Sequence, residues 1–258
     1  MRIAILADIH SKLEAFSAVP VDAREHEAVD EIWCLGDTVG CGPDPNACLD
    51  KLLSMNHVLV ARNHDVAAVG KISLADFNPY AAEACRWTTA QLSHEHLGHL
   101  ANLLLWVERT PFTLVHGSPR DPIWEYVLSI DVAQACFDHF TTPYCLVGHS
   151  HIPFICLQGQ RVAEFADAPL GSPVPLGHER LIVNPGSVGQ PRDGDPRAIC
   201  AIYLTEENGM EFHRVPDEIG LSLGERCAFQ GCQSTWGSAC SMGVSLNHGQ
   251  PRYYVKVI

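Results

Sequence analysis

Short apolar runs alternate with helix-like segments in the first half of the chain. The runs RIAILA, EIWCLG and HVLVA begin at Arg2, Glu31 and His57, and each is followed by polar residues and then by helical spacing of apolar positions. An alternating order of strands and helices predicts a largely parallel sheet. In such sheets the functional residues lie in loops just beyond the carboxyl ends of the strands, so we expect the chemistry of this chain to lie there.

The middle of the chain changes from a helical to a strand-like pattern. Residues 78–107 have apolar positions three and four residues apart, which predicts one or two helices that form a flank or cap. Beyond residue 111, apolar runs such as FTLVHG, YCLVGH, PFICLQ, RLIVNPG, AICAIYL and MEFHRV are separated by tight Gly and Pro turns. We therefore expect a second sheet, and the pattern alone indicates an α/β fold.

The end of the chain has a different composition. We expect a domain over residues 1–216 and an atypical tail over 217–258, which is rich in Cys, Gly and Ser and has neither helical nor strand periodicity. The tail contains Cys227, Cys232, Cys240 and His248. Their spacing lacks the C-x-x-C pair common in small zinc sites, so we predict no metal site there.

Composition limits the partners of this chain. Its 258 residues, 47% of them hydrophobic, are enough for one sizeable core. The net charge of −13 lacks the basic footprint that a long nucleic acid needs, so none is expected as a partner. A small anionic substrate would need local positive charge, such as metal ions.

The sequence also predicts a cytoplasmic location. The apolar run at the N-terminus is broken by Asp8, which is unfavourable in a secretory signal. No uncharged stretch approaches the roughly 18–20 residues that span a bilayer, so no membrane partner is expected. The eleven cysteines stand mostly alone in apolar contexts, which indicates buried, reduced thiols.

Candidate chemistry lies in five short polar groups, each at the end of an apolar run. They are Asp8-Ile9-His10, Gly36-Asp37, Asn63-His64-Asp65, His116-Gly117 and Gly148-His149-Ser150-His151. Any one of them has an ordinary explanation as a cap, a turn or a satisfied polar residue. Together they predict a shared site, because loops at one edge of a sheet converge in space. Oxygen and nitrogen donors without thiolate suit Mn, Fe, Zn, Ni or Co in an open catalytic site.

The order of these groups resembles that of the calcineurin-like metallophosphoesterase superfamily: D-x-H, G-D, G-N-H-D/E, H and G-H-x-H. The resemblance runs from residue 1 to about 216 and is closest to small bacterial metallophosphoesterases of the YfcE-like type, including NPGSVGQPRDGDPRA at 184–198. It implies a four-layer α/β/β/α sandwich of two mixed sheets. It also implies two divalent metal ions at one sheet edge, with manganese preferred.

The resemblance further implies a role for each residue. Asp8, His10 and His151 would hold one metal, Asn63, His116 and His149 would hold the other, and Asp37 would bridge the two. A carboxylate suits the bridge because its oxygens offer several lone pairs, whereas a neutral imidazole offers one. The implied reaction is hydrolysis of a phosphodiester or phosphomonoester by a hydroxide activated between the metals. His64 would stabilise or protonate the leaving oxygen, and Asp65 would fix the tautomer of His64.

One residue departs from the family pattern. Arg62 stands where the family usually has Gly, directly before Asn63. If that position needs a positive φ, Arg62 would strain the loop; otherwise its side chain points outward or toward a substrate phosphate, and we favour a structural role. The weaker candidates for substrate contact are Arg62, Arg120, Asn184, Ser187 and Arg192.

Several functions share this motif set. The small bacterial relatives often show phosphodiesterase activity, so a small phosphodiester is the preferred substrate, with a dinucleoside polyphosphate or a protein phosphoserine or phosphothreonine as alternatives. A non-enzymatic alternative is a scaffold, like the metallophosphoesterase-like subunit of retromer. The complete ligand set and the presence of His64 favour an enzyme. A mononuclear or purely structural metal site, in which Asp37 is dispensable, is the third possibility.

Overall fold

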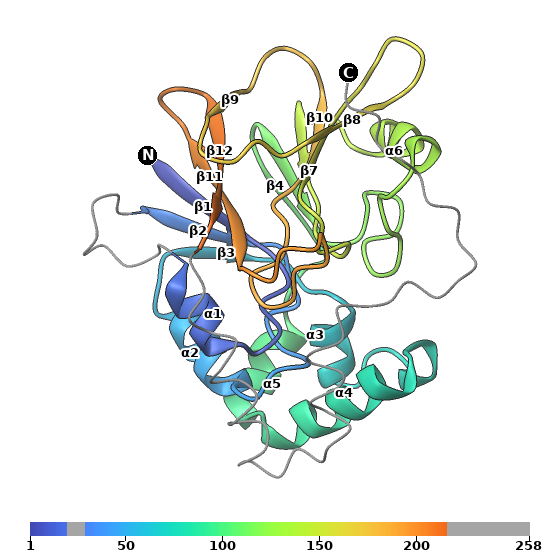
Figure 1. The fold of residues 1–258 in the computed structure, drawn as a ribbon. Coiled ribbons are helices and arrows are strands. Elements are labelled where there is room, and N and C mark those ends of the chain that lie inside the picture. The colour runs from blue at the N-terminus through green and yellow to red at the C-terminus, as the bar shows by residue number, and fades with distance from the viewer. Residues whose placement is uncertain (20–28, 216–258) are drawn as a thin grey trace.

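The computed structural model describes residues 1–19 and 29–215, which contain two mixed sheets of six strands each (Figure 1). The first sheet, in spatial order, consists of β3 (His57–Leu59), β2 (Glu31–Cys34), β1 (Arg2–Leu6), β11 (Ile199–Leu204), β12 (Gly209–Arg214) and β9 (Val174–Pro175). The second consists of β4 (Trp106–Arg109), β5 (Phe112–Val115), β6 (Tyr144–Leu146), β10 (Leu181–Asn184), β7 (Phe154–Leu157) and β8 (Glu164–Asp167). The expected second sheet is therefore present.

Helices cover the outer faces of the two sheets. They are α1 (Leu13–Ala18), α2 (Pro45–Leu53), α3 (Asn63–Ala68), α4 (Pro79–Gln91), α5 (His94–Ala101) and α6 (Ile130–Cys136), with short 3₁₀ helices η1 (Leu74–Asp76) and η2 (Phe137–His139). Side chains of α1 and α2 pack on the first sheet, and those of α6 and η2 pack on the second. In Figure 1, α1 to α5 gather below the sheets and α6 stands beside the second sheet. This arrangement confirms the four-layer sandwich.

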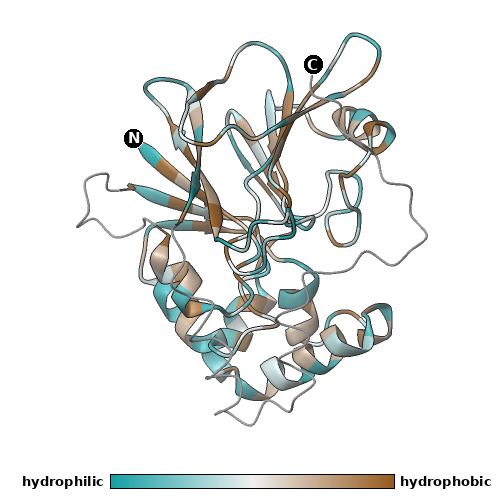
Figure 2. Ribbon diagram, viewed as in Figure 1, coloured by the Kyte–Doolittle hydropathy of each residue, from teal (hydrophilic) through white to brown (hydrophobic). Residues whose placement is uncertain are grey.

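Alternation along the strands explains why both faces of each sheet are buried. In β1, Ile3 and Ile5 face the other sheet, whereas Ala4 and Leu6 face the helices. Strands buried on both faces read as continuous apolar runs, as they do in this sequence. Figure 2 shows the hydrophobic colour concentrated on the strands and on one side of the helices.

Aromatic rings join the two sheets. Phe112 of β5 is fully buried, and its ring centroid lies 5.4 Å from that of Trp33 in β2 and 4.8 Å from that of Tyr203 in β11. Within its own sheet Phe112 also contacts Tyr144, at 5.1 Å between centroids. Such pairs stabilise a core by about 0.5–1.5 kcal/mol beyond the area that they bury. This packing between the sheets thus fixes the position of one sheet edge relative to the other.

The segment 78–107 forms two helices and part of a strand. Helices α4 and α5 fill most of it and pack with α2 and α3 around a small apolar cluster that includes Leu92 and Leu100. Trp106 and Val107 belong instead to β4, which pairs with β5. The spacing of apolar residues alone does not reveal where the helices end and β4 begins, because a strand of four residues is too short to show a clear alternation.

Two other expectations concern the cysteines and the membrane. None of the eight cysteines in the described ranges forms a disulfide, and all of them except Cys41 are buried. Within residues 1–19 and 29–215, no helix has the length and apolar character needed to cross a bilayer. The tail over 217–258, with its cysteines, lies outside the described residues.

Candidate metal centre

The predicted ligands lie beyond the carboxyl ends of parallel strands. Strands β1, β2 and β3 run parallel in the first sheet, as do β5, β6 and β10 in the second. The segments after β1, β2, β3, β5 and β6 carry, in chain order, Asp8 and His10, Asp37, Asn63 at the start of α3, His116, and His149 and His151. All of these side chains are buried. Packing of the two sheets face to face brings the loops of both sheets together.

Four of these side chains form one compact group of donors. The ligand atoms of Asp8, His10, Asp37 and His151 all lie within 4.8 Å of one another. His10 Nε2 lies 3.3 Å from Asp37 Oδ2, and His151 Nε2 lies 3.2 Å from Asp8 Oδ1. The two imidazole Nε2 atoms are 3.4 Å apart. We call this group the first ligand set; it contains the three residues predicted for one metal and the predicted bridge.

Backbone carbonyls orient two of the histidines. His151 Nδ1 lies 2.6 Å from the carbonyl oxygen of Gln190, and His116 Nδ1 contacts the carbonyl oxygen of Leu35. A ring nitrogen that donates to a carbonyl carries the proton, so Nε2 of each ring keeps a lone pair. This is the usual orientation of a histidine that binds a metal.

Unpaired acceptors show that the site fits a cation. Among the described residues, Asp8 Oδ2, Asn63 Oδ1 and His116 Nε2 are buried without a hydrogen-bond partner. His116 Nε2 also lies 3.4 Å from Asp8 Oδ1, so a lone pair faces a carboxylate. Buried acceptors in such numbers are unfavourable unless a cation or a donor compensates them. The donor set therefore suits a divalent metal ion of the kind that oxygen and imidazole nitrogen bind.

The protonation states also favour metal binding. Burial opposes ionisation of Asp37, but Arg62 and the neighbouring His64 and His10 outweigh it and lower the pKa of Asp37 to about 2. Burial likewise opposes ionisation of Asp8, yet nearby histidines and Arg62 hold its pKa well below the usual value. Burial lowers the pKa of His10. Ligands must be deprotonated to bind a metal, and these groups already are at neutral pH.

The ligands adopt unusual backbone conformations. Asp8, His10, Asp37, His149 and His151 have φ values of 55°, 51°, 51°, 66° and 59°. Residues other than glycine rarely occupy this left-handed region, and each costs on the order of 1 kcal/mol or more. The surrounding loops hold the conformations, as when the N–H of His10 donates to the carbonyl of Asp37 at 2.8 Å. Strained residues of this kind cluster at functional sites, and here they are predicted ligands.

Arg62 lies inside the site. Its backbone is extended, with φ −144° and ψ −178°, so replacing Gly with Arg causes no strain in the loop. Its side chain is only 3% exposed. Nη1 contacts Asp37 Oδ2 and lies 3.4 Å from Asp8 Oδ1, while Nη2 lies 3.1 Å from His149 Nε2. The outward orientation considered from the sequence is wrong, because the guanidinium points at the ligand carboxylates.

His64 and Asp65 have different surroundings. The ring of His64 lies edge-on to that of His10, with centroids 5.0 Å apart, and its Nδ1 lies 3.3 Å from Cys85 Sγ. Burial lowers the pKa of His64 to about 4. The carboxylate of Asp65 accepts hydrogen bonds from the backbone N–H groups of Asp37, Val39 and Arg62. Asp65 thus organises the loops, and its carboxylate oxygens are used by these N–H groups and not by the imidazole of His64.

The weaker candidates for substrate contact separate into two kinds. Asn184 and Ser187 are fully buried. Asn184 Nδ2 donates to the carbonyl of Gly148, and Ser187 Oγ donates to the carbonyl of Asp8. The amide of Asn184 and the hydroxyl of Ser187 therefore support the loops of the predicted ligands, which contradicts the expectation that they contact substrate. The arginines are more accessible: Arg120 pairs with Glu125 at 3.3 Å, and the half-buried Arg192 contributes to lowering the pKa of His64.

Some site residues gave no signal in the sequence. The carbonyls of Leu35 and Gln190 orient histidines, but a carbonyl is present in every residue. Tyr126 stacks on His149, with centroids 3.6 Å apart, and the carbonyl of Trp124 lies 3.1 Å from His149 Nε2. The aromatic side chains were visible in the sequence, but aromatic residues more often belong to the core, so their contact with a ligand could not be predicted.

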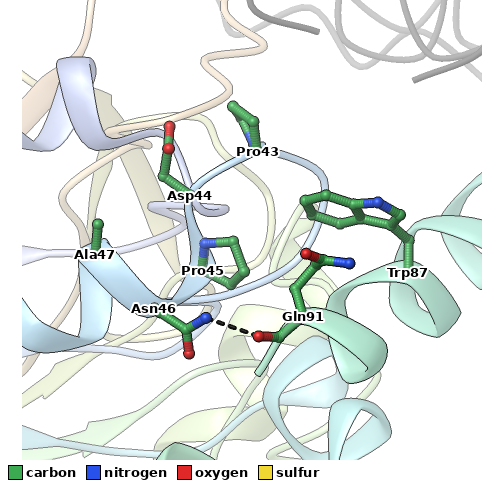
Figure 3. A pocket seen from close by; sticks show the side chains of 7 residues that line it. All are labelled: Pro43, Asp44, Pro45, Asn46, Ala47, Trp87 and Gln91. Atoms are coloured by element: carbon green, nitrogen blue, oxygen red, sulfur yellow. Dashed lines mark hydrogen bonds between the residues drawn. The ribbon is translucent and has the colours of Figure 1, made fainter. Parts of the chain in front are cut away.

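A pocket of about 460 Å³ lies along the loop that follows Asp37. Its walls include Pro43 and Pro45 of this loop and Trp87 of α4 (Figure 3). The same loop approaches the site at Gly40, whose carbonyl accepts a hydrogen bond from Thr88 of α4. None of the predicted metal ligands lines the pocket. It is therefore a neighbour of the metal centre, and the centre itself is closely packed.

The fold is that of a metallophosphoesterase. The calcineurin-like phosphoesterase superfamily domain matches residues 1–208, and this chain belongs to that family. The resemblance inferred from the five polar groups is thereby confirmed.

Similar proteins cover most of the chain. A metallophosphoesterase from Sphaerobacter thermophilus is 40% identical with a TM-score of 0.82, and the match covers 95% of this chain and all of that one. The uncharacterized protein MJ0912 of Methanocaldococcus jannaschii is 36% identical over 223 residues, 84% of this chain and 88% of its own length. The hypothetical protein PH1004 of Pyrococcus horikoshii OT3 is 16% identical with a TM-score of 0.73; the match covers 94% of this chain and 98% of that one and shows the fold alone.

Proposed function

We propose that this chain hydrolyses a phosphodiester or phosphomonoester with the help of divalent metal. The observation that carries the proposal is the first ligand set: four buried donors, within 4.8 Å of one another, in a chain of the calcineurin-like phosphoesterase family. Asp8, His10 and His151 would hold the metal, and Asp37 would share it with the neighbouring cation position. The family pattern places a second ion at that position, with Asn63, His116 and His149 as its ligands.

A metal ion held by these residues would supply Lewis acidity for water activation and for offsetting the charge of the phosphate. The protein residues supply position and charge. The carbonyls of Leu35 and Gln190 fix the imidazoles of His116 and His151, so their lone pairs point into the site. Burial of the whole set excludes bulk water, which strengthens each electrostatic contact.

His64 is the residue we assign to the leaving group. It adjoins the first ligand set through His10 and is 7% exposed. With its pKa lowered by burial, the ring is neutral at pH 7 and acts as a hydrogen-bond donor to the leaving oxygen. Asp65 supports this residue indirectly, by holding the loops of Asp37 and Arg62.

A small phosphodiester is the substrate class that we prefer. The preference follows the resemblance to small bacterial phosphodiesterases. The pocket beside Trp87 offers an indole ring and two prolines to an organic substituent of a phosphate ester. Of the two arginines outside the centre, Arg192 interacts electrostatically with His64 and is therefore the better candidate to contact a phosphate oxygen. A dinucleoside polyphosphate and a phosphorylated Ser or Thr side chain use the same chemistry and belong in the same screen, whereas a scaffold would turn over none of these.

The test is metal-dependent turnover. Purified protein is stripped of metal with a chelator and assayed with bis(p-nitrophenyl) phosphate, p-nitrophenyl phosphate, a phosphopeptide and a dinucleoside tetraphosphate. Mn²⁺, Fe²⁺, Zn²⁺, Ni²⁺ or Co²⁺ is then added back. We expect no turnover without metal, recovery with Mn²⁺, and faster cleavage of the diester than of the monoester.

A matched pair of histidine variants completes the test. His10→Ala removes a ligand, whereas His94→Ala alters an exposed histidine of α5. Turnover should disappear in the first variant and persist in the second. Equal turnover in both variants, or no turnover of any phosphate ester by metal-loaded wild type, would contradict the proposed function.

A further inference from the structure

The position expected for a second metal ion contains a positive charge from the protein itself. The guanidinium of Arg62 contacts Asp37, the predicted bridge, and His149, a predicted ligand of the second metal. It also lies 3.4 Å from Asp8. An arginine with 3% exposure and these partners is held in place, because moving it would leave two buried carboxylates without a counter-charge.

We propose that in this chain the guanidinium of Arg62 replaces the second metal ion, so that the centre binds a single divalent ion in the first ligand set. The inference rests on the proposed function and changes the number of ions from two to one. It makes Asp37 a bridge between a metal and an arginine. Its Oδ2 atom is placed for this, since it contacts Nη1 of Arg62 and lies 3.3 Å from Nε2 of His10.

Competition for lone pairs supports the replacement. A neutral imidazole has one lone pair. If Nε2 of His149 accepts from Arg62, its proton is on Nδ1, and the ring has no lone pair left for a metal. Only if Nε2 instead donates to the carbonyl of Trp124, also 3.1 Å away, does Nδ1 become a ligand atom. Arg62 and a second ion therefore require opposite tautomers of His149.

Charge balance leads to the same conclusion. The carboxylates of Asp8 and Asp37 bring two negative charges to a site that is closed to solvent. The positive charge of one divalent ion and Arg62 together already exceeds the negative charge of these two carboxylates. A second divalent ion would add two positive charges next to a guanidinium, which stays charged throughout the pH range in which proteins fold. In the first ligand set the contacts of Arg62 are with the carboxylates of Asp37 and Asp8, whereas His10 and His151 make no hydrogen bond to Arg62 among the described residues, so both imidazoles remain ligands for one ion.

The remaining ligands of the second position take a different role. Asn63 Oδ1 and His116 Nε2 have no hydrogen-bond partner among the described residues. Next to a guanidinium they act as acceptors for hydrogens of water or substrate. Arg62 Nε is buried and also without a partner there, so the guanidinium keeps one unused hydrogen-bond donor inside the site. A guanidinium provides charge and hydrogen bonds to phosphate, but it cannot bind and acidify water as a metal does.

Metal stoichiometry tests the inference independently of activity. Wild type, Arg62→Ala, Arg62→Gly and a control, Arg86→Ala, are stripped with a chelator and titrated with Mn²⁺ by calorimetry. Arg86 is a suitable control because it is exposed and pairs only at the surface with Glu83, at 2.8 Å. Manganese per chain is then measured by elemental analysis, and electron paramagnetic resonance distinguishes an isolated Mn²⁺ ion from a spin-coupled pair.

We expect one isolated ion per chain in wild type and in Arg86→Ala, and a spin-coupled pair in Arg62→Ala and Arg62→Gly. Two ions in wild type, or one ion in folded Arg62 variants, would overturn the inference. If neither Arg62 variant folds, the wild-type count decides: one ion supports the inference and two ions reject it. Two ions with turnover would reject the inference and leave the proposed function intact, whereas one ion without turnover of any ester would reject the function and leave the stoichiometry standing.

Discussion

The side chain of Asn184 ties the end of β10 to the loop that carries two predicted ligands: its Nδ2 donates to the carbonyl of Gly148 at 2.6 Å. The same amide donates to Ser150 Oγ at 3.0 Å and accepts from the N–H of Gly186 at 2.8 Å. His149 and His151 alternate with these contacts along the loop, and both have positive φ. The amide therefore helps to hold a strained loop in the conformation that points its imidazoles inward.

Asn184→Ala should weaken metal binding without removing a ligand. The substitution leaves the N–H of Gly186 without its acceptor and removes one of the two donors to the carbonyl of Gly148, which costs about 1–3 kcal/mol of unfolding free energy. Loss of such support typically lowers metal affinity about 10–100-fold. Calorimetric Mn²⁺ titration and urea unfolding measure the two effects. The control is Asn102→Ala, which removes an exposed amide that donates to Gly98 at 2.7 Å; equal metal affinities in the two variants would contradict the positioning role.

Asp37→Asn tests whether the shared carboxylate is essential. The amide keeps the shape of the side chain but removes the charge that both the metal and Arg62 use. Turnover of bis(p-nitrophenyl) phosphate should fall by more than the roughly 100-fold loss typical of a merely supporting group. Circular dichroism checks that the fold survives. Asp195→Asn, at a partly exposed carboxylate paired with Arg197, should leave turnover unchanged; unchanged turnover in Asp37→Asn would support a site in which this carboxylate is dispensable.

The convergence of the candidate ligands could be predicted from the sequence because their position depends on local order. Asp8, Asp37 and His116 each follow an apolar run directly, and parallel strands place such residues at one sheet edge whatever the details of packing. The four layers followed from the family resemblance, and alternation along β1 and β2 then determined which face of each strand meets the other sheet.

Side-chain direction could not be predicted in the same way. Arg62 points inward because loops distant in sequence, at Asp8 and His149, place acceptors around it. Asn184 and Ser187 were weaker candidates for substrate contact since they occupy a Gly- and Pro-rich loop. In the structure their side chains instead donate hydrogen bonds to the backbone carbonyls of Gly148 and Asp8. These contacts depend on how the two sheets pack together. Such contacts have no signature in a single sequence.

Gly40→Ala should disturb the metal centre because the added methyl group would press against His10 and His64. A Cβ atom at Gly40 would lie 2.8 Å from His10 Nδ1, closer than real Cβ atoms approach a neighbour, and 3.0 Å from His64 Nδ1, which is tighter than most real contacts. Gly70→Ala is the matched control, because both glycines have positive φ but nothing lies within 4 Å of a Cβ at Gly70. Both variants should lose roughly 1 kcal/mol or more of stability from backbone strain. Only Gly40→Ala should also lower Mn²⁺ affinity, and the same affinity in both would show that His10 and His64 tolerate the added methyl group.

His64→Ala should affect the leaving group more than the metal. Groups that assist proton transfer contribute about 10²–10⁴-fold to rate, with the larger share for leaving groups of high pKa. The kcat of His64→Ala should therefore fall strongly with an alkyl phosphodiester and less with bis(p-nitrophenyl) phosphate, while manganese content stays at the wild-type value. His64→Asn keeps a donor and should retain part of the rate. An equal loss with both kinds of ester would contradict the assignment of His64 to the leaving oxygen.

Arg62→Ala should make the protein dependent on metal for its stability. Removing one partner of a buried ion pair typically costs about 3–5 kcal/mol, because the other charge is left uncompensated. Here Asp8 and Asp37 would both lose the guanidinium. In chelator, urea unfolding of Arg62→Ala should show a loss of this size relative to wild type and to Arg86→Ala. Added Mn²⁺ should restore more stability to Arg62→Ala than to wild type, since two ion positions are then available to compensate the carboxylates. Equal stabilisation of both proteins by Mn²⁺ would mean that the arginine and the metal do not compete for the same acceptors.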